Sequence, residues 1–128
     1  KLINYNTMKY ILRLMIVGLL FSSCGNTNNS VNPTEKNLAS KVAYADEINK
    51  VVVFESHYKM LVFALKKGQD LKPHSATMDA PLIMLEGSAM VTIGTTETTV
   101  KKGDIITLPK DSMHGVSPIT NCKFLLIK

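Results

Sequence analysis

The chain has 128 residues, enough for one domain, and an ordinary globular composition of 45% hydrophobic and 20% charged residues. Its net charge is +5, but Lys1, Lys9 and Arg13 lie in the first 23 residues, which hold no acid. Beyond them the chain has neither Arg nor Trp, so the composition gives no support to a nucleic-acid-binding surface.

From Met8 the chain has the order of a secretory signal. Lys9 and Arg13 form a basic start, residues 14–21 are an apolar stretch, and two serines precede Cys24. The apolar stretch is shorter than the roughly 20 residues that span a bilayer. The alternative is a buried N-terminal helix that ends in an incidental cysteine.

The segment 20–25, Leu-Phe-Ser-Ser-Cys-Gly, resembles the lipobox of bacterial lipoproteins. The resemblance implies cleavage before Cys24 and acylation of that residue, and several acyl chains hold a protein firmly on a membrane. We therefore expect residues 1–23 to be upstream residues plus a signal peptide. The mature protein is then an exported, membrane-anchored lipoprotein of the cell envelope.

A polar, Asn-rich segment follows, and we expect residues 24–39 to be the lipidated cysteine and a flexible tether. Residues 40–128 form the predicted domain. Only residues 35–49 favour a helical turn or two. Cys122 lies in a strand-like segment, which favours a buried small hydrophobic residue over a reactive thiol.

The domain is predicted to be all-β, because short apolar runs alternate with Gly, Lys and Asp breakers. The runs are 51–54, 60–65, 81–86, 89–93, 98–100, 104–109, 114–116 and 124–127. Even spacing of short strands indicates a sandwich or barrel, and a barrel removes the exposed edges of a small sheet.

Two motifs in this region resemble those of the cupin superfamily. Gly68 stands six residues before His74, and Gly87 closes the following strand. The second motif is Gly-Asp at 103–104, an apolar strand, a proline and then His114. The resemblance implies a small jelly-roll β-barrel. It also implies a homodimer, because small cupins usually pair through strands.

In metal-binding cupins the corresponding ligands are three histidines and a glutamate. Carried over by position, they become His74, Ala76, Ala80 and His114, so two of the four ligands are alanine. Two neutral imidazoles hold a divalent transition metal such as Zn²⁺ or Cu²⁺ only weakly. The variant reading Pro-His-Ser-Ala at 73–76 implies no settled activity.

Other side chains near this region could replace the missing ligands. Met78, Met84 and Met113 suit Cu(I) by chemistry, although gap-filling in the barrel is the simpler interpretation. Alternation places Met84 inward and Met113 away from His114. Asp79 is expected to face outward.

His57 lies in a turn and is expected to be exposed. Lys72, two residues before His74, is predicted to share its face and add positive charge near the mouth of the barrel.

The resulting hypothesis is a non-catalytic binding barrel for a small, anionic molecule, with His74, His114, Lys72 and Met84 as binding residues. The rival is a metal-dependent oxidoreductase or isomerase that uses the two histidines and an unrecognised third ligand. A structural module with a vestigial cavity is the third hypothesis. No catalytic residue can be named, and no cofactor is firmly implied.

Overall fold

The computed structural model describes residues 37–128, so the predicted signal peptide and Cys24 lie outside the described residues. Within this range one short 3-10 helix, η2 (Leu38–Lys41), precedes the strands. The strands are β1 (Asn49–Glu55), β2 (Lys59–Leu65), β3 (Leu71–His74), β4 (Ala80–Glu86), β5 (Ser88–Ile93), β6 (Thr96–Lys101), β7 (Ile105–Leu108), β8 (His114–Pro118) and β9 (Cys122–Ile127). None of the described helical segments could span a bilayer.

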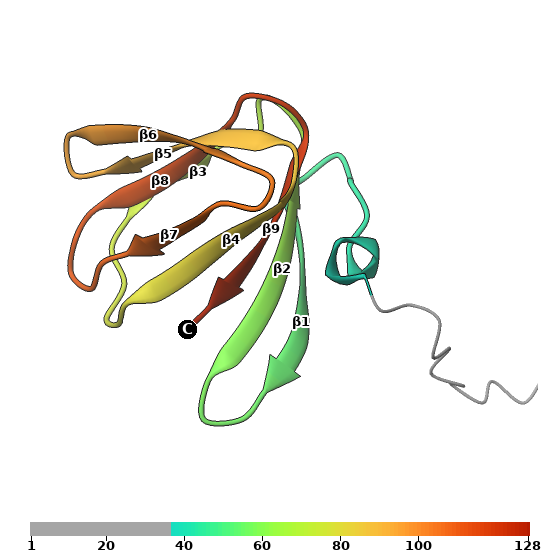
Figure 1. Ribbon diagram of the computed structural model, residues 1–128, viewed down its shortest axis with the longest axis horizontal. Coiled ribbons are helices and arrows are strands. Elements are labelled where there is room, and N and C mark those ends of the chain that lie inside the picture. The colour runs from blue at the N-terminus through green and yellow to red at the C-terminus, as the bar shows by residue number, and fades with distance from the viewer. Residues whose placement is uncertain (1–36) are drawn as a thin grey trace, which may run out of the picture. The chain divides into compact units, whose positions relative to one another are not determined.

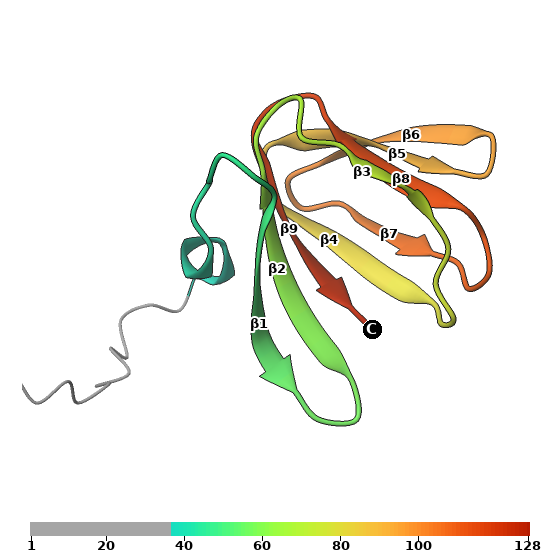
Figure 2. The same ribbon diagram turned by 180° about the vertical axis from the view of Figure 1, so that it is seen from behind.

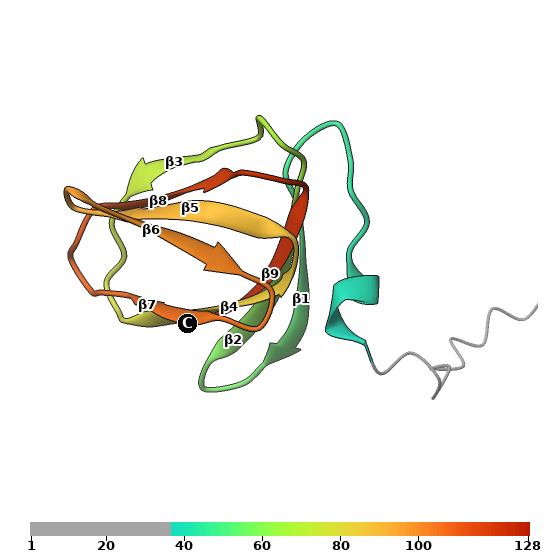
Figure 3. The same ribbon diagram turned by 45° about the horizontal axis from the view of Figure 1, so that its top comes forward.

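The strands form two antiparallel sheets that face each other (Figures 1 and 2). One sheet has the order β1-β2-β9-β4-β7 and the other the order β3-β8-β5-β6. Figure 3 shows the four-stranded sheet lying over the five-stranded one. The predicted all-β barrel is therefore confirmed, and every predicted apolar run coincides with or overlaps a strand.

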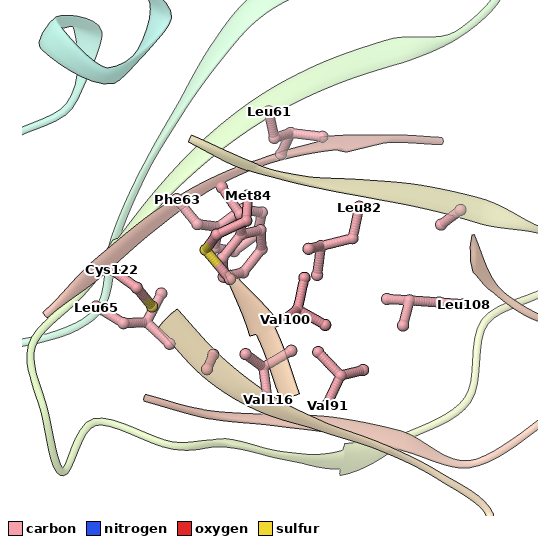
Figure 4. Packing of buried hydrophobic residues seen from close by; sticks show 13 residues of the cluster. Leu61, Phe63, Leu65, Leu82, Met84, Val91, Val100, Leu108, Val116 and Cys122 are labelled. Carbon is pink, nitrogen blue, oxygen red and sulfur yellow. The ribbon is translucent and has the colours of Figure 1, made fainter. Parts of the chain in front are cut away.

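The core lies between the two sheets, where alternate residues of each strand point inward (Figure 4). Along β2 these are Leu61, Phe63 and Leu65, and along β9 they are Cys122 and Phe124. The rings of Phe63 and Phe124 stack with centroids 5.0 Å apart. These two strands supply much of the apolar floor beneath the site described below.

The opposite face of the five-stranded sheet is also covered. Val62, Ala64 and Leu125 point away from the barrel interior and pack with Val42 in a second buried cluster. Because β2 is buried on both faces, its sequence is a continuous apolar run and not an alternating one.

Polar contacts hold the N-terminal segment on this outer face. The Lys123 ammonium donates to the Ala39 carbonyl at 2.8 Å, and the Tyr44 hydroxyl donates to Glu86 at 2.8 Å. Lys123 also lies 4.8 Å from the centre of the Tyr44 ring. Ala39 is buried, so the packed structure begins inside the segment 24–39 that was expected to be tether. The predicted helical turn is η2.

Strand β3 is the one strand among the described residues that the apolar runs do not predict, because a Lys-Pro pair interrupts it. Leu71 pairs with Val116 and His74 pairs with His114. Three steps along β3 therefore match two steps along β8, which defines a β-bulge. The bulge shifts the alternation of β3 by one residue.

Strand β1 lies at one edge of the five-stranded sheet and exposes apolar side chains. Val52 is 49% exposed and Phe54 is 45% exposed. Exposed strand edges are surfaces on which other chains can pair. The homodimer stays a prediction, since the structure describes a single chain.

The turn between β4 and β5 requires glycine. Gly87 has φ +72°, and a Cβ there would lie 2.1 Å from the Asn121 carbonyl oxygen. We predict that Gly87→Ala lowers the free energy of unfolding by about 3 kcal/mol or more, because backbone must move. Gly94 has φ +60°, and a Cβ added there would have no atom within 4 Å. Gly94→Ala should therefore lower the free energy of unfolding by only about 1 kcal/mol. Urea unfolding measures both, and equal losses would contradict the clash.

Candidate functional site

The pairing of β3 with β8 brings two histidines together. His74 and His114 are direct partners across the two strands. Their rings meet edge to face, with centroids 4.7 Å apart and planes inclined at 65°. The structure therefore places the two predicted site histidines side by side at one end of the barrel.

Backbone contacts determine which nitrogen of each ring is protonated. Nδ1 of His74 lies 2.9 Å from the carbonyl of Lys72, and Nδ1 of His114 lies 2.9 Å from the carbonyl of Ser112. A carbonyl can only accept, so each neutral ring carries its proton on Nδ1. The Nε2 lone pair of each ring is then left as a hydrogen-bond acceptor or metal ligand.

Burial keeps His114 neutral. Its residue surface is 3% exposed, whereas His74 is exposed at the mouth. Loss of solvent lowers the pKa of His114 below its usual 6.5, and the neighbouring His74 lowers it further. The hydrogen bond to Ser112 acts in the opposite direction without overcoming burial. His114 is therefore an uncharged acceptor at neutral pH.

Both histidines line a cavity of about 680 Å³, a size suited to a small organic ligand. Most of the wall is apolar, with Phe63, Leu82 and Phe124 contributed by the five-stranded sheet. The side chains of Ala76 and Ala80, at the two substituted ligand positions, also line the cavity. The arrangement is an apolar chamber with a few polar groups.

The residues at this end do not fit the four-ligand metal centre that the cupin resemblance implies. The second histidine and the glutamate are replaced by Ala76 and Ala80, which offer no donor atom. Among residues 37–128 no group of three or more His, Cys, Asp or Glu side chains could hold a metal ion. Two imidazoles are fewer than the three protein ligands that catalytic metal sites typically use.

Lys72 does not share the inward face with His74, contrary to the sequence prediction. It is exposed and lies outside the cavity wall. The physical reason is the bulge in β3, which pairs Leu71 and His74 with Val116 and His114. With the alternation shifted, Leu71 lines the cavity in the place expected for Lys72.

Met84 points inward as alternation predicted, but it does not line the cavity. It is 1% exposed and lies opposite Phe124, in the close-packed part of the barrel near Phe63 and Cys122 (Figure 4). Its side chain packs in the core, so the structure does not place Met84 on the cavity wall, where it was predicted to bind a ligand.

The remaining candidates lie where the sequence suggested. Met113 is 52% exposed and does not line the cavity. Asp79 accepts a hydrogen bond from the backbone of Lys110 at 2.8 Å and is not in the cavity wall. His57 is exposed as expected, yet it also lines the cavity mouth together with Met78.

Cys122 is fully buried, as the sequence favoured. Loss of solvent raises the pKa of its thiol to about 11, and the nearby Glu86 adds to the shift. A buried thiol that stays protonated at neutral pH is a poor nucleophile.

Sequence reasoning missed three lysines of the cavity wall: Lys50, Lys59 and Lys128. Lys59 is two residues from Leu61, which faces the core, so alternation along β2 could have placed it inward. It was overlooked because a lysine at a strand end is usually solvated.

No protein-family model matches the chain, and no curated protein matches it significantly. Solved structures do match. A cupin 2 conserved barrel domain protein from Leptotrichia buccalis is 32% identical with a TM-score of 0.67, covering 71% of this chain and 45% of that protein. An RmlC-like cupin from Desulfovibrio desulfuricans is 28% identical with a TM-score of 0.64, covering 71% and 91%. A conserved Streptococcus pyogenes protein of unknown function is 28% identical, with a TM-score of 0.61, covering 66% and 75%.

The lowered pKa of His114 predicts a dependence of stability on pH. The unfolded histidine has a pKa near 6.5 and the folded one a lower value, so the unfolded state binds the proton more readily. The free energy of unfolding should therefore fall as pH decreases from 6.5 toward the folded pKa. We expect His114→Asn to flatten this decrease between pH 7.5 and 5.5. Urea unfolding at several pH values measures it, and parallel curves for wild type and His114→Asn would contradict it.

Proposed function

We propose that this chain, whose described domain has the cupin fold, is an envelope lipoprotein that binds a small organic molecule in its barrel without catalysing a reaction. The observation that carries the proposal is the histidine pair. His74 and His114 line an apolar cavity, and each has its Nδ1 occupied by a backbone carbonyl. Their Nε2 atoms are thus two neighbouring acceptors for a donor group on a ligand.

The cavity wall gives little support to catalysis. Among residues 37–128 no Asp or Glu side chain lines the cavity, so this part of the chain supplies no carboxylate general acid or base to the wall. The thiol of Cys122 is buried in the core and does not reach the cavity. A histidine pair without a carboxylate partner in an apolar chamber is better suited to holding a ligand than to transforming one.

A metal-dependent enzyme remains the second candidate, and one observation favours it. Metal-bound histidines usually donate their other ring N–H to a carbonyl or carboxylate. Both histidines here make such a contact through Nδ1. Under this alternative His74 and His114 would hold a divalent transition metal with help from the ligand or solvent.

Phenol is a minimal probe for the binding proposal, since it combines an apolar ring with one O–H donor. We expect phenol to bind in the millimolar range in the presence of a chelator, because Nε2 of the pair accepts a hydrogen bond from its O–H group. His74→Ala should abolish the perturbation of cavity amide signals in NMR titrations. Lys72→Ala, on the same strand as His74 but outside the cavity wall, should leave binding within about twofold. Binding that requires added Zn²⁺ or Cu²⁺ would contradict the proposal and favour the enzyme.

The lipid anchor belongs to the same proposal and is supported by the signal-like order before Cys24. We expect Cys24→Ala to lose incorporation of labelled palmitate and to leave the membrane fraction. Cys122→Ala is the matched control, because its thiol is buried in the core, and it should keep the label. Equal labelling of both variants would contradict acylation at Cys24.

A further inference from the structure

Two lysines face each other at the end of the five-stranded sheet. The backbone N–H of Lys59 donates to the carbonyl of Lys128, and the N–H of Lys128 donates to the carbonyl of Lys59. Residues that exchange both hydrogen bonds in an antiparallel pair have their side chains on the same face. Like charges directly opposite each other are destabilising. Both lysines line the cavity, so two like charges lie on the same wall.

The positive charge of this wall is only partly compensated. Glu55 lies 2.7 Å from the Lys59 ammonium, but both side chains are about half exposed, and such pairs contribute little. In the described part of the chain, neither Lys128 nor Lys50 has a carboxylate side chain within ion-pair distance. Lys50 lies opposite Phe63 and adds a third cation to the cavity.

The two sheets that line the cavity therefore carry different polar groups. The β3–β8 side offers acceptors, because Nε2 is the free nitrogen of His74 and of His114. The β2–β9 side offers ammonium donors. Apolar residues lie between them, and along β9 the inward positions run from Phe124 through Leu126 to Lys128. The apolar wall from Phe124 to Leu126 leads to Lys128 and provides a surface on which an apolar body can pack.

Resting on the proposed function, we infer that the ligand is a carboxylic acid whose apolar body carries a hydroxyl or amine at the end away from the carboxylate. The ammonium groups of Lys59 and Lys128 bind the carboxylate, with Lys50 adding positive charge. Nε2 of His74 and of His114 accepts from the hydroxyl or amine. The acid also relieves the repulsion between the paired lysines, so binding stabilises the wall that it occupies.

The histidines are not the groups that bind the carboxylate. Neutral imidazoles with Nδ1 bonded to carbonyls present lone pairs to the cavity, and a carboxylate has no proton to donate to them. The anion therefore belongs at the lysine side and the donor at the histidine side. The two sides recognise different groups of one molecule.

Four small molecules of similar size test this directly: 4-hydroxyphenylacetate, phenylacetate, 2-(4-hydroxyphenyl)ethanol and phenol. We expect 4-hydroxyphenylacetate to bind about tenfold more tightly than phenol, since a hydrogen bond to a charged group is added. It should also bind several-fold more tightly than phenylacetate and 2-(4-hydroxyphenyl)ethanol, each of which lacks one end. NMR titration with the full chain, in chelator, gives the four dissociation constants.

Substitutions of the cavity lysines test whether they bind the carboxylate of the ligand. Lys59→Gln and Lys128→Gln should each remove most of the advantage of 4-hydroxyphenylacetate over 2-(4-hydroxyphenyl)ethanol. Lys72→Gln is the matched control, because Lys72 is an exposed strand lysine near His74 but outside the cavity. The double variant Lys59→Gln/Lys128→Gln should remain folded, because it removes two like charges from the same wall. Its amide NMR spectrum verifies that it is folded.

The outcomes separate this inference from the proposed function. If phenol binds through His74 but the carboxylate adds nothing, the inference is overturned and the binding function stands. An equal loss from Lys72→Gln would also overturn it, since attraction to surface charge would then suffice. If none of the four molecules binds, the inference and the proposed function both fail.

Discussion

The register between β3 and β8 determines the chemistry of the cavity. His74 is opposite His114 only because a bulge takes up one extra residue of β3, and the same bulge excludes Lys72 from the wall. Gly115 makes this close approach feasible. A Cβ at this position would lie 3.0 Å from the Leu71 carbonyl oxygen, tighter than ordinary contact. The geometry of the two imidazoles thus depends on backbone contacts beside them.

The barrel separates two kinds of polar group across an apolar interior. One sheet supplies two imidazoles that accept, and the other supplies ammonium groups that donate. Ala76 and Ala80 place methyl groups at two positions where a metal-binding cupin has ligand side chains, and this is where the chain departs most from such a cupin. The departure leaves room in the cavity beside the two imidazoles.

Much of the fold could be predicted from the sequence, because apolar runs and turn residues report directly on short strands. The two histidines could be placed from their spacing to Gly68, Gly87 and the Gly-Asp pair. The bulge could not, since it arises from pairing between strands and leaves no signal in β3 alone. Lys59 and Lys128 were missed for a related reason: their proximity comes from the pairing of β2 with β9, which are far apart in sequence.

The contacts around Lys123 define how the domain would bear a load. If the chain is fixed to a membrane at its N-terminal side, tension along it reaches the fold first at Ala39, which Lys123 holds through a hydrogen bond. Resistance there comes from the Tyr44–Glu86 bond and the apolar cluster around Val42, on the sheet face opposite the cavity. Under tension this segment would separate from the outer face of the five-stranded sheet before the strands themselves separate. The cavity could then keep its shape while the segment that links it to the membrane is under mechanical stress.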